Sequence, residues 1–261
     1  MPPKALILRT AGTNCDRESA FAFETAGAVA ERIHVNRLIE NPHLLDDFQI
    51  LCLPGGFSYG DDLGAGRVLA SQIVVHFRDR VQKFLDRGNL AIGICNGFQV
   101  LVKTGLLPGP VSKDEPLFAQ TVTVTYNDSG KFEDRWVHLR ADTDRCVFLA
   151  KGEIIYLPVA HGEGKVIPLN EEHRKTLAKL GRVALRYVGP AGQDKPGYPA
   201  NPNGSLGDIA GLCDATGRVL GLMPHPERHL TGLQHPTWTR MGPAAEGDGR
   251  RMFTRAVAYF K

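Results

Sequence analysis

The sequence predicts an α/β protein with an open, mostly parallel sheet, helices on both faces and added antiparallel strands. In its first part, short apolar runs alternate with segments whose apolar residues recur at helical spacing. After Pro108 the runs become short and alternating, as at 121–124 and 136–139, which is typical of antiparallel strands. With 261 residues, 43% of them hydrophobic, the chain can form one large core. We expect a single domain over residues 1–261, with a C-terminal extension from about residue 229.

The first half is expected to contain four strands, at residues 5–8, 29–35, 48–53 and 90–94, the last of them a buried strand. A helix should begin near Asp16, whose charge suits a helix N-terminus, and end at Gly27. A long helix ended by Gly88 is expected from a stripe of apolar residues, namely Leu69, Ile73, Phe77, Val81 and Leu85.

In the second half we expect a glycine-rich loop at 158–165, a helix at 170–180 and a loop at 198–207. Residues 209–213 and 219–223 are predicted to form a hairpin with its turn at 214–217. A polar connection then leads to a closing helix with an apolar face formed by Met252, Phe253, Ala256, Val257 and Phe260.

The composition excludes several classes of function. The net charge is +3 with both signs mixed along the chain, so we expect no nucleic-acid or membrane partner. Five scattered cysteines without a CxxC pair argue against a disulfide framework or a zinc site. The apolar run at 5–8 is too short for a signal peptide, so the expected location is cytoplasmic. No GxxxxGK[ST] or GxGxxG segment is present, and no nucleotide site is assigned.

The strongest chemical signal is Cys95. It follows a buried strand, precedes a helix and stands between Gly93 and Gly97. This pattern is a nucleophile elbow with sulfur in place of a serine oxygen, and the helix N-terminus favours the thiolate. Cys15 also precedes a helix, but it lacks the flanking glycines and is the weaker candidate.

His225 and Glu227 are the expected partners of that nucleophile. They alternate with Pro224 and Pro226, and each proline favours an extended conformation in the residue before it. Residues two apart in an extended chain face the same side, so the imidazole and the carboxylate should lie together. A metal site formed with His229 is less favoured, because the spacing is not that of HExxH and no fourth ligand is evident.

An oxyanion hole needs two convergent N–H donors. At an elbow the first is the amide after the nucleophile, which belongs to Asn96. The second is expected from Gly56, since Pro54-Gly55-Gly56 ends the neighbouring strand and glycine lets the backbone approach closely.

Three motifs in this order resemble the class I, triad-type glutamine amidotransferases: Pro-Gly-Gly at 54–56, Gly-Ile-Cys-Asn-Gly-Phe-Gln at 93–99 and Pro-His-Pro-Glu at 224–227. Further segments, at 12–18, 55–61, 160–164 and 201–205, resemble the glutaminase component of phosphoribosylformylglycinamidine synthase. The resemblance extends from Leu6 to about Arg228. The tail at 249–253 is more similar to the end of the long, fused form of that enzyme.

The resemblance implies a flavodoxin-like glutaminase in which Cys95, His225 and Glu227 hydrolyse L-glutamine through a γ-glutamyl thioester. It also implies that ammonia passes to a synthetase subunit, which converts formylglycinamide ribonucleotide to its amidine. The synthetase is expected either as one chain or together with a small bridging subunit. No cofactor is implied for this chain, and ATP and Mg are expected on the synthetase. Four candidate substrate-binding residues follow from the matched segments: Phe57, Gln99, His161 and Glu163. For the last two, a contact with the synthetase or a solvated loop are alternatives.

Two other functions remain open at this point. The chain could be a cysteine hydrolase of another small amide or peptide, which a panel of amide substrates would distinguish. It could also be a non-catalytic docking subunit, although the presence of Cys95, His225 and Glu227 argues against this.

Overall fold

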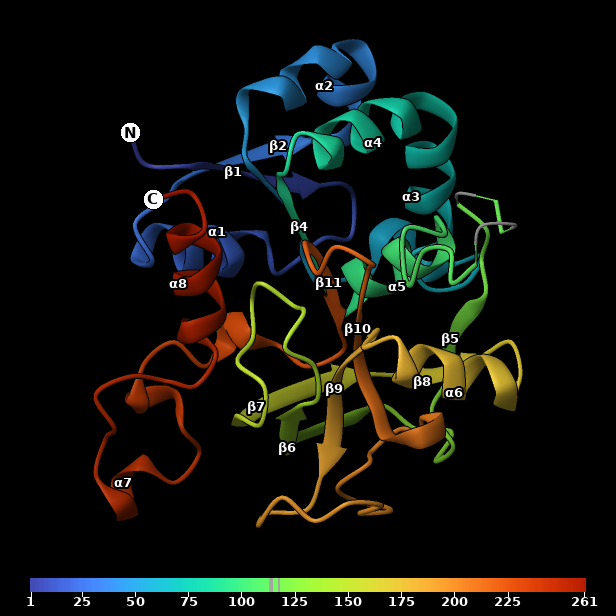
Figure 1. Ribbon diagram of the computed structural model, residues 1–261. Coiled ribbons are helices and arrows are strands. Elements are labelled where there is room, and N and C mark those ends of the chain that lie inside the picture. Colours follow the sequence, from blue (N-terminus) through green and yellow to red (C-terminus); the bar gives the residue numbers. More distant parts are fainter. Residues whose placement is uncertain (113–114, 117) are drawn as a thin grey trace.

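Five parallel strands form one half of an open sheet. They are β1 (Lys4–Arg9), β2 (Val29–His34), β3 (Ile50–Leu53), β4 (Leu90–Ile94) and β11 (Val219–Leu222). In this computed structural model, which describes residues 1–112, 115–116 and 118–261, they lie in the order β2-β1-β3-β4-β11 (Figure 1). The carboxyl ends of β3, β4 and β11 are therefore neighbours, where open α/β sheets place their ligands.

The same sheet continues with four antiparallel strands, in the order β10-β9-β6-β7 after β11. They are β10 (Ile209–Cys213), β9 (Val183–Val188), β6 (Glu133–Ala141) and β7 (Ile154–His161). A separate antiparallel pair is formed by β5 (Val122–Tyr126) and β8 (Glu163–Pro168). The expected parallel core with antiparallel additions is confirmed, and the predicted hairpin is β10–β11.

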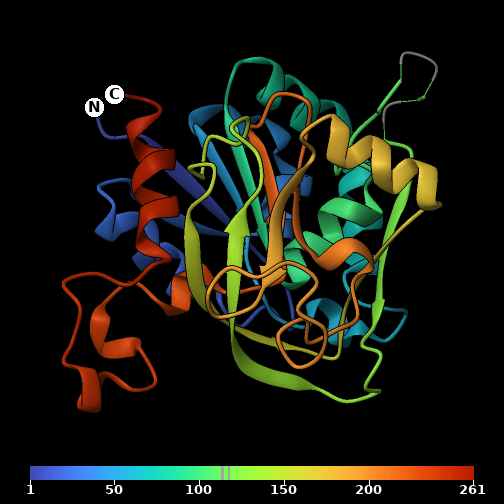
Figure 2. The same ribbon diagram turned by 60° about the horizontal axis from the view of Figure 1, so that its bottom comes forward.

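Helices cover both faces of the parallel half (Figure 2). On one face, α1 (Asp16–Thr25) packs against the closing helix α8 (Arg250–Ala258), with the rings of Phe23 and Phe253 edge to face at 5.0 Å. The other face carries α2 (Val35–Glu40), α3 (Arg67–Gln72), α4 (Arg78–Asp86) and α5 (Asn96–Lys103).

The remaining helices lie in the second half or between strands. They are α6 (Glu171–Lys179) and α7 (Trp238–Met241). The short 3-10 turns are η1 (Pro42–Asp47), η2 (Ser58–Asp61), η4 (Leu206–Asp208), η5 (Pro226–Arg228) and η6 (Gly232–Gln234). Among the residues described, none of these or the other helices has the length and apolar character that a membrane span requires.

The long helix expected up to Gly88 is interrupted. A π-helical turn, η3 (Ile73–Phe77), separates α3 from α4. The apolar stripe has a uniform spacing of four residues, which drifts around a regular helix of 3.6 residues per turn. The wider turn compensates for this drift, and all five residues of the stripe are buried: Leu69, Ile73, Phe77, Val81 and Leu85.

The prediction of a glycine-rich loop at 158–165 is wrong, because these residues belong to β7 and β8 with only Gly162 between them. Gly164 is a strand residue, and a Cβ atom there would lie 2.4 Å from Cε1 of His161. This glycine marks the close approach of a side chain rather than a loop. Strand β9 and helix α7 were not expected from the sequence pattern.

Candidate active site

Cys95 stands at a sharp turn between β4 and α5. Its backbone angles are φ 52° and ψ −106°, a conformation that costs energy for a residue with a side chain. The two flanking glycines are required by packing. A Cβ atom on Gly97 would lie 1.8 Å from the carbonyl oxygen of Leu53, and one on Gly93 would lie 2.5 Å from that of Gly97. Strand, turn and helix are thus compressed around the sulfur.

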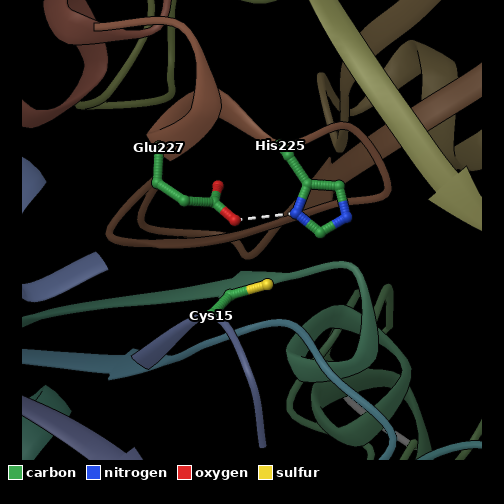
Figure 3. Close-up of side chains that lie close together, drawn as sticks. All are labelled: Cys15, His225 and Glu227. Atoms are coloured by element: carbon green, nitrogen blue, oxygen red, sulfur yellow. Dashed lines mark hydrogen bonds and ion pairs between the residues drawn. The ribbon is translucent and has the colours of Figure 1, made fainter. Parts of the chain in front are cut away.

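His225 and Glu227 form a buried pair just after β11. The Nδ1 atom of His225 lies 2.7 Å from Oε1 of Glu227 (Figure 3). Both side chains are almost fully buried. The His225 amide donates to the carbonyl of Pro158 at 2.8 Å, which ties this segment to β7. Because an ionised carboxylate only accepts, Nδ1 always carries a proton, and Nε2 is the nitrogen that gains and loses one.

The pKa of His225 is raised well above its usual value. Burial alone would lower it, but the negative charge of Glu227 and the thiol of Cys95 outweigh that effect. Among the described residues, Nε2 of His225 has no hydrogen-bond partner. A strongly basic nitrogen is therefore free to exchange a proton with a nearby thiol.

Three side chains converge on Gly55. A Cβ atom there would lie 2.9 Å from Cε1 of His225, 3.1 Å from Sγ of Cys15 and 3.5 Å from Cβ of Cys95. The structure thus brings Cys95 and His225, 130 positions apart in the sequence, to within 3.5 Å of the same point beside Gly55. No role was predicted for Gly55 from the sequence, and the Pro-Gly-Gly motif was the signal that pointed to this position.

Cys15, the weaker candidate nucleophile of the sequence, is the second thiol at this site, although nothing in the sequence predicted that it lies beside His225 and Glu227. Its Sγ, a nitrogen of His225 and an oxygen of Glu227 all lie within 4.8 Å of one another (Figure 3). These three ligand types suit a soft divalent metal ion, but Arg228 donates to Sγ of Cys15 at 3.1 Å and places a positive charge there. Burial raises the pKa of the Cys15 thiol, which makes it a weak nucleophile.

The two expected oxyanion donors lie on adjacent strand ends. Gly56 has φ 147° and forms a bridge with Thr13, and a Cβ atom on it would lie 2.7 Å from the carbonyl of Gly12. Within the described part of the chain, no hydrogen bond uses the amide of Gly56 or of Asn96. Both N–H groups are therefore available to an oxygen beside Cys95.

A cavity of about 200 Å³ opens beside Cys95. Its walls contain every residue named as a candidate for substrate binding, together with one of the two oxyanion residues: Gly56, Phe57, Gln99, His161 and Glu163. Gln99 is already engaged, since its Nε2 donates to the carbonyl of Glu163 at 2.5 Å and its Oε1 accepts from Asn96 at 2.9 Å. It holds the wall of the cavity, whereas the exposed ring of Phe57 lies at the rim.

The chain is similar to known proteins over its whole length. A family model described as a CobB/CobQ-like glutamine amidotransferase domain matches residues 2–260. The phosphoribosylformylglycinamidine synthase subunit PurQ of Dehalococcoides mccartyi is 50% identical over 98% of this chain and 97% of its own. The PurQ subunit of Methanococcus maripaludis is 40% identical, and the match covers 100% of this chain and 99% of that subunit.

A chain in the structure of PurLQS from Thermotoga maritima matches with a TM-score of 0.74 and 33% identity over 100% of both chains. The match with the PurQ subunit of M. maripaludis covers 100% of this chain, so it includes the tail at residues 249–253. The matches in sequence, length and fold agree with the site described above, and the chain therefore belongs to the CobB/CobQ-like glutamine amidotransferases and, within them, to the PurQ subunits of phosphoribosylformylglycinamidine synthase.

Proposed function

We propose that this chain hydrolyses L-glutamine to glutamate and ammonia as the glutaminase subunit of phosphoribosylformylglycinamidine synthase. One observation carries the assignment of residues. The Cys95 turn and the His225–Glu227 pair meet at Gly55, beside two unused amides and a cavity. A cysteine, a paired histidine and two N–H donors are the parts that attack on a carboxamide requires.

In the proposed reaction, His225 Nε2 takes the proton of Cys95 and the thiolate attacks the side-chain carbonyl carbon of glutamine. The amides of Gly56 and Asn96 hold the oxyanion. As the C–N bond breaks, His225 returns the proton to the leaving nitrogen and ammonia departs. His225 then removes a proton from water, which cleaves the thioester to glutamate and regenerates the thiol. Glu227 keeps His225 in the required tautomer and stabilises its charged form.

The ammonia is proposed to serve a synthetase subunit that uses ATP and Mg to convert formylglycinamide ribonucleotide to its amidine in purine biosynthesis. A small bridging subunit is part of the proposal, because the structure that matches along its full length is named PurLQS. The proposed location is the cytoplasm. Residues 1–261 are proposed to act as one glutaminase domain that binds no cofactor itself.

The test is the synthesis of the amidine by the reconstituted complex, with either glutamine or an ammonium salt as nitrogen source. The Cys95→Ala variant should lose the glutamine-dependent reaction and keep the ammonium-dependent one. If this variant still hydrolysed glutamine, Cys95 would not be the nucleophile. If wild-type protein preferred another amide in a substrate panel, the assignment of glutamine would fail.

A further inference from the structure

His161 is the last residue of β7 and lies in the wall of the cavity beside Cys95. It is 3% exposed. The preceding carbonyl, that of Ala160, lies 3.7 Å from Sγ of Cys95, so the end of β7 runs directly past the nucleophile.

The orientation of Asn127 fixes which nitrogen of His161 carries the proton. The Asn127 Nδ2 group donates to the carbonyls of Lys131 at 2.9 Å and of His161 at 2.8 Å, so its Oδ1 is the acceptor. That oxygen accepts from the amide of Gly164 at 3.0 Å and lies 3.1 Å from Nδ1 of His161. Nδ1 must therefore be the N–H, and Nε2 is an acceptor.

Within the described residues, Nε2 of His161 is buried and has no hydrogen-bond partner. Burial, with the nearby charge of His225, lowers the pKa of His161 to about 4, so the ring stays neutral at physiological pH. A buried acceptor without a donor is destabilising, which indicates that a ligand supplies the missing N–H. This acceptor complements the N–H groups of a primary carboxamide.

We propose that Nε2 of His161 accepts a hydrogen bond from the carboxamide nitrogen of the substrate and orients this nitrogen as it leaves. The inference rests on the proposed glutaminase reaction and adds a positioning residue to it. Formation of the Sγ–C bond converts the carbonyl to the oxyanion; when the oxyanion re-forms the C=O bond, the C–N bond breaks and His225 supplies the proton to the departing nitrogen. His161 gains and loses no proton. It holds one N–H so that the lone pair of the nitrogen faces His225.

This role predicts selectivity for amides over esters. A γ-ester of glutamate places an oxygen without hydrogen where glutamine has its NH₂ group, so it can offer nothing to Nε2 of His161. The thiol attack, the oxyanion contacts and the cavity are the same for both substrates. Removing His161 should therefore impair hydrolysis of glutamine and spare that of the ester.

The experiment compares kcat/KM for L-glutamine and for L-glutamate γ-methyl ester, in the complex with the synthetase subunits. For His161→Ala we expect a loss of roughly 10- to 100-fold on glutamine and a change of less than about 3-fold on the ester. His161→Gln keeps an acceptor oxygen and should recover part of the amide activity without changing the ester.

Equal losses on the amide and the ester would overturn the proposal and leave His161 a purely structural residue. The proposal would also be overturned if His161→Ala hydrolysed glutamine as fast as the wild-type protein does. Failure of the underlying glutaminase assignment gives a different result, because wild-type protein would then hydrolyse neither substrate.

Discussion

The substitution Gly55→Ala tests whether the position of His225 matters, without changing any catalytic group. The new methyl group would lie 2.9 Å from Cε1 of His225, where ordinary van der Waals contact begins at 3.4 Å. Gly55 does not have a positive φ, so alanine adds no backbone strain there. The ring is held by Glu227 at 2.7 Å, and the backbone amide of His225 is held by the carbonyl of Pro158 at 2.8 Å. Relief of the contact must therefore disturb the bond to Glu227 or shift the backbone of His225.

We expect kcat/KM for glutamine to fall by roughly 10- to 100-fold, the scale of displacing a catalytic group by a fraction of an ångström to one ångström. The crowding should also lower the free energy of unfolding by about 1–3 kcal/mol. The measurements are steady-state glutaminase kinetics in the complex and denaturant unfolding of the isolated variant.

Gly189→Ala is the matched control. It also lacks a positive φ, but the nearest atoms to its new methyl group belong to the flexible side chain of Gln193. Its activity should equal that of wild type. If Gly55→Ala kept full activity as well, His225 would tolerate displacement, and its position against Gly55 could not be part of the mechanism.

Three further predictions concern single side chains. Glu227→Gln should reduce glutaminase kcat by about 10²- to 10⁴-fold, because the imidazole loses the charge that stabilises its protonated form; an unchanged kcat would remove Glu227 from the triad. Cys15→Ser should keep kcat within about 5-fold of wild type, a limit set by the small volume change of a residue that only adjoins the dyad; loss of all activity would make Cys15 a rival nucleophile. The third concerns pH. Because the pKa of His161 falls from 6.5 to about 4 on folding, the unfolded chain binds a proton between these values that the folded chain does not. This difference at His161 should lower the free energy of unfolding by up to about 3 kcal/mol as the pH falls from 6.5 towards 4. For His161→Gln, denaturant titrations should show a smaller loss of unfolding free energy over this pH range than for the wild type. If the two proteins lost the same amount, the lowered pKa of His161 would be refuted.

The parts of the site that the sequence predicted are those with local signals. The turn at Cys95 depends on Gly93 and Gly97, which are within two residues of it, and the glycines are indeed required by contacts below 3 Å. His225 and Glu227 were expected as a pair from the two prolines within the same four residues, and the pair is present. The extended conformation expected at Glu227 is wrong, because Pro226–Arg228 form the 3-10 turn η5, in which proline suits the first position. Short apolar runs likewise identified the parallel strands β1, β3, β4 and β11, because a strand buried on both faces is continuously apolar. The edge strand β2 is mostly exposed and contains Glu31 and Arg32.

The parts that could not be predicted depend on long-range packing. Cys15 joins the dyad because the loop before α1 bridges to Gly56, a contact that leaves no trace in the residues around Cys15. The tautomer of His161 depends on Asn127, 34 residues earlier in the chain. Glycines at 162 and 164 indicated a loop, whereas the structure uses the second of them to admit a histidine ring.

The central claim is that Cys95 is the thiol that attacks glutamine, and a covalent label tests it most directly. A glutamine analogue with a reactive diazoketone in place of the carboxamide should add once per chain, and peptide mass spectrometry should find the label on Cys95. The label should be absent from Cys95→Ala and unchanged in Cys15→Ser. A label on Cys15 in the wild-type protein, with Cys95 unmodified, would contradict the account.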